Sequence, residues 1–269
     1  MGIERTEVSI VPMRSLGVSL VLYENAPAAV RGVLESLRAT PGEMHICVVD
    51  NSPTDGLRDT VTAFGVRYVH EPSNPGFGAS HNRALTELPP THFHLVLNPD
   101  ITFPERSLLS LMESLSAEPD VGIASPRVLF PNGELQYVCK RYPTVLVLFA
   151  RRFLPRRLHF LIRRKLDEFE MRDVGYERPM DVPHATGCFM LFRRAALEAV
   201  TGFDPKFFMY FEDADISFRI ARLGYRVRYY PEAHVFHHWS RASHQSWRMT
   251  LVSIRSSFYL FSKHGWRFL

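Results

Sequence analysis

The sequence has few cysteines and lacks the signals that would set it apart from ordinary globular proteins. Its 269 residues include three cysteines, Cys47, Cys139 and Cys188, which lie far apart. An odd number of widely spaced cysteines is typical of a reducing compartment, and it argues against a disulfide framework or a zinc ribbon. The sequence also has no run of 18 or more apolar residues without charges, which excludes an ordinary transmembrane helix.

The first residues lack the apolar core of a secretory signal peptide, because Glu4, Arg5 and Glu7 interrupt them. We therefore expect a cytoplasmic protein in which residues 1–16 form a leader before the folded part. Internal repeats and low-complexity stretches are also missing. Hydrophobic residues make up 46% and charged residues 22% of the chain, so it can bury a core, and predominant disorder is excluded. The length fits one large domain or two small ones.

Positive charge is concentrated in two parts of a chain whose formal net charge is only +4. The segment 151–165 carries seven basic residues and no acidic one, so the rest of the chain has a net charge of −3. The tail 241–269 is also basic without acids. Because both segments mix cations with large apolar residues, they favour contact with an anionic membrane surface. A solvated helix face is the alternative, and a nucleic-acid site is the least favoured.

Short apolar runs alternate with amphipathic segments through the first 125 residues. Strands are predicted at 18–23, 44–49, 66–69, 94–97 and 121–125, and helices at 27–37, 57–64, 79–88 and 108–115. This alternation predicts an α/β fold with a Rossmann-like, mostly parallel sheet that has helices on both faces. Later in the chain, strands are predicted at 186–192, 226–230 and 234–238, and helices at 195–199 and 216–223.

Polar clusters follow two of the predicted strands, where parallel α/β sheets bind their ligands. Asp50, Asn51 and Ser52 follow one strand, and Asn98 and Asp100 follow another. Asp50 can accept hydrogen bonds from a base or a ribose, although an Asp before a turn is also ordinary capping chemistry. Asp100 can hold Mg²⁺ or Mn²⁺ if a diphosphate supplies most of the other oxygens, or it is a simple turn residue.

A glycine-containing loop, 74–82, lies between the third predicted strand and the helix that follows. Gly76 and Gly78 let the backbone approach a ligand closely, and the free N–H groups at a helix start attract anions. These features are typical of a phosphate or sugar-nucleotide loop, and a flexible loop with an ordinary helix cap is an equal alternative. A dinucleotide fingerprint is disfavoured, because that motif follows the first strand.

Three carboxylates, Glu212, Asp213 and Asp215, follow five large apolar residues at 207–211. Their mutual repulsion should raise at least one pKa, and a carboxylate against an apolar wall can remove a proton from a hydroxyl. Helix capping is the alternative, because negative charge stabilises a helix N-terminus. Farther along, His237 is either a structural residue or a further ligand for a metal held by Asp100.

Taken together, these segments resemble the inverting glycosyltransferases of family 2, which have the GT-A fold. The matching pieces occur in the family's order between residues 17 and 243. They are 48–52, 74–82, 97–100, 186–189, 208–215 and 235–238. The pieces 74–82, 97–100 and 208–215 most resemble the rhamnosyltransferase branch, which uses dTDP-L-rhamnose.

The resemblance implies a role for each matched position. Asp213 would be the catalytic base with Glu212 beside it, and Asp100 and His237 would bind the Mg²⁺ or Mn²⁺ ion. Asn98 stands where the family has the first Asp of its Asp-x-Asp metal motif, a departure that disfavours tight binding of the free metal. The remaining implied positions are Tyr23, Glu24, Asp50, Asn51, Asn74, Gly76, Phe77, Gly78, Asn82, Asn98 and Asp100 for the nucleotide sugar, and Thr186, Gly187 and Asp215 for the acceptor side.

The implied reaction is a metal-dependent, inverting transfer of a sugar in bacterial cell-surface polysaccharide biosynthesis, such as that of O-antigen or cell wall. The donor would be a nucleotide-diphosphate sugar, and the acceptor a glycan or a polyprenyl-diphosphate-linked sugar. The enzyme would dock peripherally on the inner face of the cell membrane. UDP-galactofuranose or another activated sugar is an alternative donor. A non-catalytic sugar-nucleotide-binding membrane scaffold is an alternative of another class.

This interpretation divides the chain into five parts. They are the leader 1–16, a nucleotide-sugar-binding half 17–145, a basic insert 146–180, an acceptor and catalytic half 181–243, and a basic amphipathic C-terminal helix 244–269.

Overall fold

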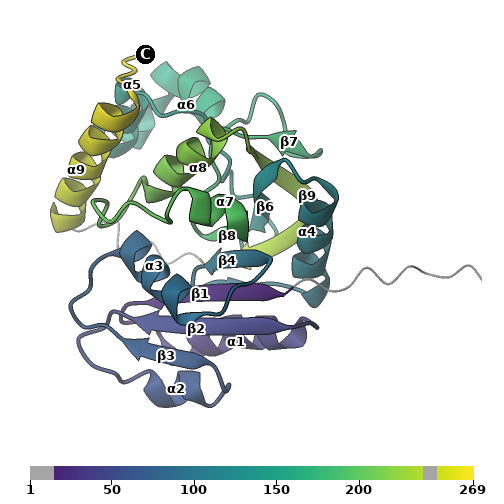
Figure 1. Ribbon diagram of the computed structural model, residues 1–269. Helices are drawn as coiled ribbons and strands as arrows, with labels where there is room; N and C mark the ends of the chain where they lie inside the picture. The colour runs from purple at the N-terminus through teal and green to yellow at the C-terminus, as the bar shows by residue number, and fades with distance from the viewer. Residues whose placement is uncertain (1–14, 239–246) are drawn as a thin grey trace, which may run out of the picture.

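In the computed structural model, which describes residues 15–238 and 247–269, the apolar runs of the first half form neighbouring strands of one sheet (Figure 1). Residues 1–14, which belong to the expected leader, lie outside the described residues. So do residues 239–246, where the predicted catalytic half ends and the predicted C-terminal helix begins. Strands β1 (Leu16–Leu22), β2 (Met44–Asp50), β3 (Arg67–His70) and β4 (Phe93–Leu97) all run parallel, in the order β3-β2-β1-β4. Their carboxyl ends therefore meet at one edge of the sheet.

Helices cover both faces of this parallel part, as predicted. Helix α1 (Pro27–Ala39) begins with a proline, whose missing N–H is harmless in the first turn. It packs with α4 (Glu105–Ala117) and α2 (Arg58–Thr62) on one face of the sheet, while α3 (Phe77–Glu87) packs on the other. Helices α1 and α4 bury apolar stripes against the sheet, whereas the buried face of α3 is made of small and polar residues.

The second half of the sheet is mixed. Strand β8 (Phe189–Arg193) runs antiparallel between β4 and β6 (Val121–Leu129), and β6 pairs in parallel with β9. The short strands β5 (Ile101–Thr102) and β7 (Met180–Asp181) pair antiparallel with β9. The prediction of two strands at 226–230 and 234–238 is wrong, because β9 (Arg226–His237) is one strand with a register irregularity. Pro231 lies at that irregularity, where a residue without an N–H interrupts the ladder.

The remaining helices gather at one end of the molecule (Figure 1). The basic insert folds as α5 (Val145–Phe153), the 3₁₀ helix η1 (Arg156–Ile162) and α6 (Arg163–Phe169). Helix α9 (Trp247–His264) lies beside α5, where Arg152 hydrogen-bonds Thr250. The chain after α9 also returns to α5, since the Val145 N–H donates to the Arg267 carbonyl at 2.8 Å. Helices α7 (Arg194–Ala199) and α8 (Glu212–Arg222) lie between these elements and the sheet.

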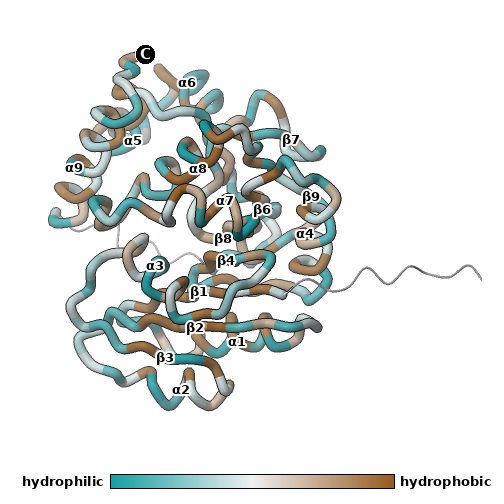
Figure 2. The backbone as a smooth tube through the Cα atoms, viewed as in Figure 1, coloured by the Kyte–Doolittle hydropathy of each residue, from teal (hydrophilic) through white to brown (hydrophobic). Residues whose placement is uncertain are grey.

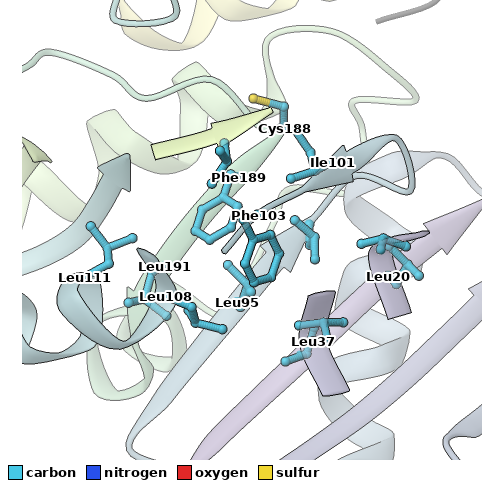
Figure 3. Packing of buried hydrophobic residues seen from close by; sticks show 14 of the residues in the cluster. Leu20, Leu37, Leu95, Ile101, Phe103, Leu108, Leu111, Cys188, Phe189 and Leu191 are labelled. Carbon is cyan, nitrogen blue, oxygen red and sulfur yellow. The ribbon is translucent and has the colours of Figure 1, made fainter. Parts of the chain in front are cut away.

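The hydrophobic colours of Figure 2 run through β1, β2 and β4, which form the centre of the core. Figure 3 shows the largest buried cluster, in which Phe103 and Phe189 pack edge to face at 5.6 Å between ring centres. Cys188 lies at one end of this cluster, close to Ile101. The buried cluster therefore extends along β8 as far as Cys188, the residue before this strand. Among the described helices, none has the length and apolar content required to span a bilayer.

Candidate active site

The carboxyl end of β2 places Asp50 at the edge where the parallel strands meet. Its side chain is fully buried. One carboxylate oxygen accepts from the Ser52 N–H at 3.0 Å, and the other accepts from the Tyr68 hydroxyl at 2.7 Å. A carboxylate can accept about four hydrogen bonds, so these two contacts orient Asp50 without exhausting it. The base contact expected for Asp50 stays a prediction, and Tyr68 on β3 is a supporting residue that the sequence patterns did not reveal.

The polar residues next to Asp50 are joined by a short hydrogen-bond network. The Asn51 side-chain amide donates to the Ser80 hydroxyl at 2.8 Å, which links β2 to α3. The Glu24 N–H donates to the Ser52 hydroxyl at 2.8 Å, and Glu24 has a left-handed φ of 50°. Tyr23 precedes it with half of its surface exposed. The structure thus brings Tyr23 and Glu24 to the same edge as Asp50, as the resemblance implied.

The loop 74–78 lies directly against the segment that precedes α8. The Phe77 N–H donates to the Phe208 carbonyl at 2.9 Å. Gly76 has a φ of 103°, and a Cβ atom on it would collide with the Phe208 backbone, 2.8 Å from its Cα. Asn74 also has a left-handed φ, of 46°. Glycine is therefore required at 76 both for its conformation and for the close approach of the two segments.

The structure assigns Asn82 a different partner from the one expected. Its side-chain amide donates to the Phe203 carbonyl at 2.7 Å, and its oxygen accepts from the Phe203 N–H at 2.8 Å. Gly78 faces the same residue, since a Cβ atom there would lie 2.7 Å from the Phe203 Cβ. These two positions hold α3 against the loop after α7. The nucleotide contact predicted for Asn82 would have to compete with these two hydrogen bonds.

Asp100 and His237 meet where β5 pairs with β9. The His237 Nε2 lies 3.3 Å from the Asp100 carboxylate, and Ile101 is the direct cross-strand partner of His237. Gln136, which the sequence analysis missed, contacts the other side of the histidine. Its amide nitrogen donates to the His237 carbonyl at 3.0 Å, and its amide oxygen lies 3.0 Å from His237 Nδ1.

These two contacts of Gln136 determine the tautomer of His237. Because the amide nitrogen of Gln136 must face the His237 carbonyl, its oxygen faces Nδ1, so Nδ1 carries the proton. In the neutral ring, the lone pair of Nε2 then points toward the Asp100 carboxylate. A lone pair and a carboxylate repel each other unless a cation or a proton lies between them. The arrangement is the one a metal ligand pair needs, with the second ring nitrogen oriented by a neighbour.

Asp100 and His237 form a pair and not a complete cage. Within residues 15–238 and 247–269, no group of three or more histidine, cysteine or acidic side chains has the geometry of a metal site. Mg²⁺ and Mn²⁺ are commonly held by one or two protein ligands together with substrate phosphates. The residues present therefore fit an ion that binds with a diphosphate. Asn98, whose N–H donates to the Cys188 carbonyl at 2.9 Å, lies beside them.

Asp213 lies in the first turn of α8 and points toward β8. Its carboxylate accepts from the Gly187 N–H at 2.9 Å and from the Ala214 N–H at 2.8 Å. Gly187 lies between Asp213 and the loop 74–78, because a Cβ atom on Gly187 would lie 3.4 Å from the Asp213 Cβ and 3.5 Å from Phe77. The structure therefore brings Phe77, Gly187 and Asp213 together, from three distant parts of the chain.

Burial changes the proton affinity of the two adjacent carboxylates. Burial and the charge of Asp213 raise the pKa of Glu212 to about 8. Burial also raises the pKa of Asp213 above its ordinary value, although the N–H groups of Gly187 and Ala214 oppose this change. One oxygen of Glu212 is buried without a hydrogen-bond partner among the described residues. Because Asp213 accepts two backbone N–H groups while one oxygen of Glu212 has no partner among the described residues, a single proton on this pair is better placed on Glu212, which leaves Asp213 as the carboxylate able to accept one.

Cys188 connects the pair Asp100 and His237 with Asp213. Its backbone carbonyl binds Asn98, and the residue before it binds Asp213. Burial raises the pKa of the Cys188 thiol to about 12, and the negative charges of Asp100 and Asp213 both add to this effect. The turn that carries Asn98 and Asp100 and the first turn of α8 therefore meet at two adjacent residues, Gly187 and Cys188.

The structure places Asp215, expected on the acceptor side, against α9. It is fully buried and forms ion pairs with Arg219 at 2.8 Å and Lys263 at 2.7 Å and a hydrogen bond with His264 at 2.7 Å. Successive helix residues point in different directions, so Asp215 faces α9 while Asp213 faces β8. Thr186, which was also expected on the acceptor side, precedes Gly187. Its hydroxyl donates to the Val138 carbonyl at 2.5 Å.

A hollow of about 500 Å³ lies elsewhere, at the opposite end of β2. It is lined by residues at the starts of β2 and β3 and by the ends of α1 and α3, among them Met44, Arg67 and Glu87. None of the predicted site residues borders it. The chemistry-bearing residues thus converge at the edge of the sheet and not in this hollow.

Comparison with known proteins identifies a glycosyltransferase family. The family model of glycosyl transferase family 2 matches residues 20–201, which end before α8. An N-acetylglucosaminyl-diphospho-decaprenol L-rhamnosyltransferase of Mycobacterium tuberculosis is 27% identical over 93% of this chain and 86% of its own length. Rhamnosyltransferase WbbL of Escherichia coli is 26% identical over 78% of each chain.

A solved structure supports the fold assignment. The mannosyltransferase PcManGT of Pyrobaculum calidifontis, in complex with GDP-Man and Mn²⁺, superposes with a TM-score of 0.63 at 20% identity. The match covers 94% of this chain and 64% of that protein's chain. The predicted GT-A fold is therefore confirmed.

Proposed function

The chain belongs to glycosyl transferase family 2, in its rhamnosyltransferase branch, and we propose that it transfers L-rhamnose from dTDP-L-rhamnose. The proposed acceptor is a glycan or a polyprenyl-diphosphate-linked sugar in bacterial cell-surface polysaccharide biosynthesis. The names of the relatives support this choice of sugar and of a lipid-linked acceptor. The observation that carries the proposal is the convergence of Phe77, Asp100 and Asp213 on the adjacent residues Gly187 and Cys188.

The proposed chemistry follows from the charges of this site. The acceptor hydroxyl attacks the anomeric carbon while Asp213 takes its proton, and the nucleoside diphosphate leaves from the opposite face. One displacement inverts the stereochemistry and needs no covalent intermediate. Glu212 keeps Asp213 in its proton-accepting form, because the two N–H groups that donate to Asp213 stabilise its charge, whereas a buried oxygen of Glu212 has no such partner among the described residues.

Asp100 and His237 would hold a Mg²⁺ or Mn²⁺ ion together with the donor diphosphate. Such an ion neutralises the negative charge that develops on the leaving diphosphate. Gln136 keeps His237 Nε2 available as a ligand. Asn98 in place of a carboxylate lowers the negative charge of the site, so we expect the metal to bind tightly only when the diphosphate is present.

A panel of nucleotide sugars tests this function. Purified protein is incubated with dTDP-L-rhamnose, UDP-galactofuranose, GDP-mannose and UDP-glucose, each with Mg²⁺, Mn²⁺ or a chelator. We expect thermal stabilisation and slow nucleotide release with dTDP-L-rhamnose and a divalent ion, and transfer when polyprenyl-diphosphate-linked N-acetylglucosamine is added. Preference for another donor would replace the rhamnose assignment, and nucleotide binding without any turnover would favour the non-catalytic scaffold.

We also propose that the enzyme docks on an anionic membrane surface through its insert and C-terminal region. Large apolar side chains are exposed there beside cations. The two basic segments are neighbours, because the chain after α9 forms a hydrogen bond with the start of α5. Some insert cations already pair with acids of α6, such as Arg164 with Glu168 at 2.8 Å. The exposed apolar residues are Phe149, Phe153, Phe160, Leu161, Trp247, Leu251, Phe258, Trp266, Phe268 and Leu269.

Sedimentation with vesicles tests this docking. We expect the protein to pellet with vesicles that contain phosphatidylglycerol, and much less with phosphatidylcholine alone. Replacing Phe160 and Leu161 by serine should weaken the binding, whereas Leu223→Ser, an exposed leucine on the C-terminal side of α8, should not. Equal binding to both vesicle types, or none to either, would reject the proposal. A change of oligomeric state in the serine variants would instead assign these residues to a contact between protein copies.

A further inference from the structure

The segment 204–215, which leads into the catalytic carboxylates, is held from one side by the C-terminal helix α9. The Ser256 hydroxyl donates to the Met209 carbonyl at 2.8 Å, in the middle of the segment. The Tyr259 hydroxyl donates to the Asp204 carboxylate at 2.8 Å, at its start. The fully buried Phe207 ring packs against Tyr259 at 4.8 Å between ring centres. One face of α9 thus contacts this segment along much of its length.

Lys263 joins the two ends of the same segment. Its ammonium group lies 2.6 Å from the Asp204 carboxylate and 2.7 Å from the Asp215 carboxylate. Asp215 is fully buried, and only 16% of the Asp204 side chain is exposed. Asp215 also pairs with Arg219, but Lys263 is the cation that contacts both carboxylates and so bridges the two ends. Removing its ammonium takes away this bridge and the attraction that opposes the repulsion between Asp204 and Asp215, so the ends of the segment should separate.

The backbone between these ends is in an uncommon conformation. Tyr210 and Phe211 are consecutive residues with left-handed φ angles of 70° and 69°. Such a conformation costs about 1–3 kcal/mol for each residue that is not glycine, and it persists only where the surroundings hold it. Phe211 directly precedes Glu212 and Asp213 at the start of α8. The direction in which the two carboxylates leave the backbone is therefore set by a strained turn.

The loop 74–78, which we call the donor loop because the proposal assigns it to the nucleotide sugar, holds the segment from the other side. The hydrogen bond from Phe77 to Phe208 and the close approach of Gly76 join it to the turn just before the strained residues. The catalytic turn thus lies between a loop from residues 74–78 and a helix from residues 247–264. Neither neighbour is close to it in the sequence, and α9 lies outside the range of the family match.

We propose that α9 is a clamp that positions the catalytic carboxylates, with Lys263 as its main positioning residue and Ser256 as its second. The clamp maintains the turn at Tyr210 and Phe211, and through it the position of Asp213 relative to the donor loop. This inference rests on the proposed role of Asp213 as the base. It concerns turnover and not donor affinity, because among the described residues no hydrogen bond or ion pair joins α9 to Asp50, Asp100 or His237.

The first test replaces Lys263. Lys263→Met should lower kcat about 10- to 100-fold, since a small displacement of a catalytic group has an effect of that order. The affinity for dTDP with Mn²⁺, measured by calorimetry, should stay within about twofold of the wild type. Lys263→Arg, which keeps the charge, should recover most of kcat. Ser257→Ala, which removes only a hydrogen bond within α9 to the Ile254 carbonyl, is the control and should change neither quantity.

A matched pair of serine variants covers the case in which Lys263→Met does not fold. Ser256→Ala removes the hydrogen bond to Met209, while Ser262→Ala removes only a bond within α9, to the Tyr259 carbonyl. We expect Ser256→Ala to lower kcat severalfold at unchanged dTDP affinity and Ser262→Ala to behave as wild type. Equal kcat in both serine variants, or a folded Lys263→Met protein with wild-type kcat and only a lower melting temperature, would overturn the clamp.

The outcome is separable from that of the proposed function. If Asp213→Asn keeps wild-type turnover, the base assignment fails and the clamp loses its meaning. If Asp213→Asn is inactive while Lys263→Met retains full kcat, the base assignment stands and the clamp alone is wrong.

Discussion

The first turn of α8 carries carboxylates in two opposite environments within four residues. Asp213, on the face toward β8, is half-buried and the adjacent Glu212 is buried; neither forms an ion pair among the described residues, and burial raises the pKa of both groups. On the face toward α9, burial alone would raise the pKa of Asp215, but His264, Lys263 and Arg219 hold it below its ordinary value. Burial is common to both faces, so the presence of compensating charge distinguishes a group suited to proton transfer from one suited to anchoring.

The largest expected effect is on the face toward β8. Asp213→Asn keeps the size of the side chain but removes the proton acceptor, so transfer should fall about 10³-fold or more. The measurement is the initial rate at saturating donor and acceptor, with dTDP affinity as the control for folding. Turnover within threefold of the wild type would show that the two faces do not differ in the proposed way.

The second effect is on the face toward α9 and concerns stability. Asp215→Asn leaves Arg219 and Lys263 beside a neutral amide, and breaking a buried ion pair in this way costs about 3–5 kcal/mol. Urea denaturation measures the change in the free energy of unfolding. Glu198→Gln breaks the pair with Arg194, in which the Glu198 side chain is 54% exposed, and should cost at most about 1 kcal/mol. Similar losses in the two variants would contradict the distinction.

Two histidines extend the comparison. His264 is paired with Asp215 inside the clamp, whereas His237 is oriented by the neutral amide of Gln136. Gln136→Met keeps the volume of the side chain but frees the His237 ring, so the affinity for Mn²⁺ in the presence of dTDP should fall about tenfold. A Mn²⁺ titration followed by electron paramagnetic resonance measures this. An unchanged affinity would mean that Gln136 does not act through the metal ligand.

The last prediction concerns the pH dependence of stability. The folded protein holds a proton on Glu212 up to about pH 8, while an unfolded chain loses it near the ordinary glutamate pKa. Between these values the folded state binds more protons, so the free energy of unfolding should decrease as the pH rises from about 5 to 8. Glu212→Gln should remove most of this decrease. Urea titrations at several pH values measure it, and an unchanged slope would remove Glu212 from the explanation.

Sequence patterns predicted the elements of the first half within a few residues. The strand predicted at 44–49 is β2 at Met44–Asp50, and the helix predicted at 27–37 is α1 at Pro27–Ala39. These elements could be predicted because apolar periodicity and the proline at position 27 act over short distances along the chain. The prediction was less accurate at β9, where two strands were expected around Pro231.

The candidate site could be predicted only in part. Asp50, Asp100, Asp213 and His237 stand in recognisable motifs, and the structure brings Asp100, Asp213 and His237 to one site. Gln136 has no motif around it, and its role depends on a contact with a residue 101 positions away. The contacts of Asp215 with α9 could not be predicted for the same reason, because its partner His264 is 49 positions away.

The amino-acid sequence by itself determined the alternation of strands and helices, the family and the residue types that carry the chemistry, because these depend on local patterns. Only the tertiary structure decided that Asp213 faces β8 while Asp215 faces α9, and that Gln136 orients His237. The physical reason is that a carboxylate or an imidazole takes its proton affinity from the groups around it, and folding brings those groups from distant parts of the chain.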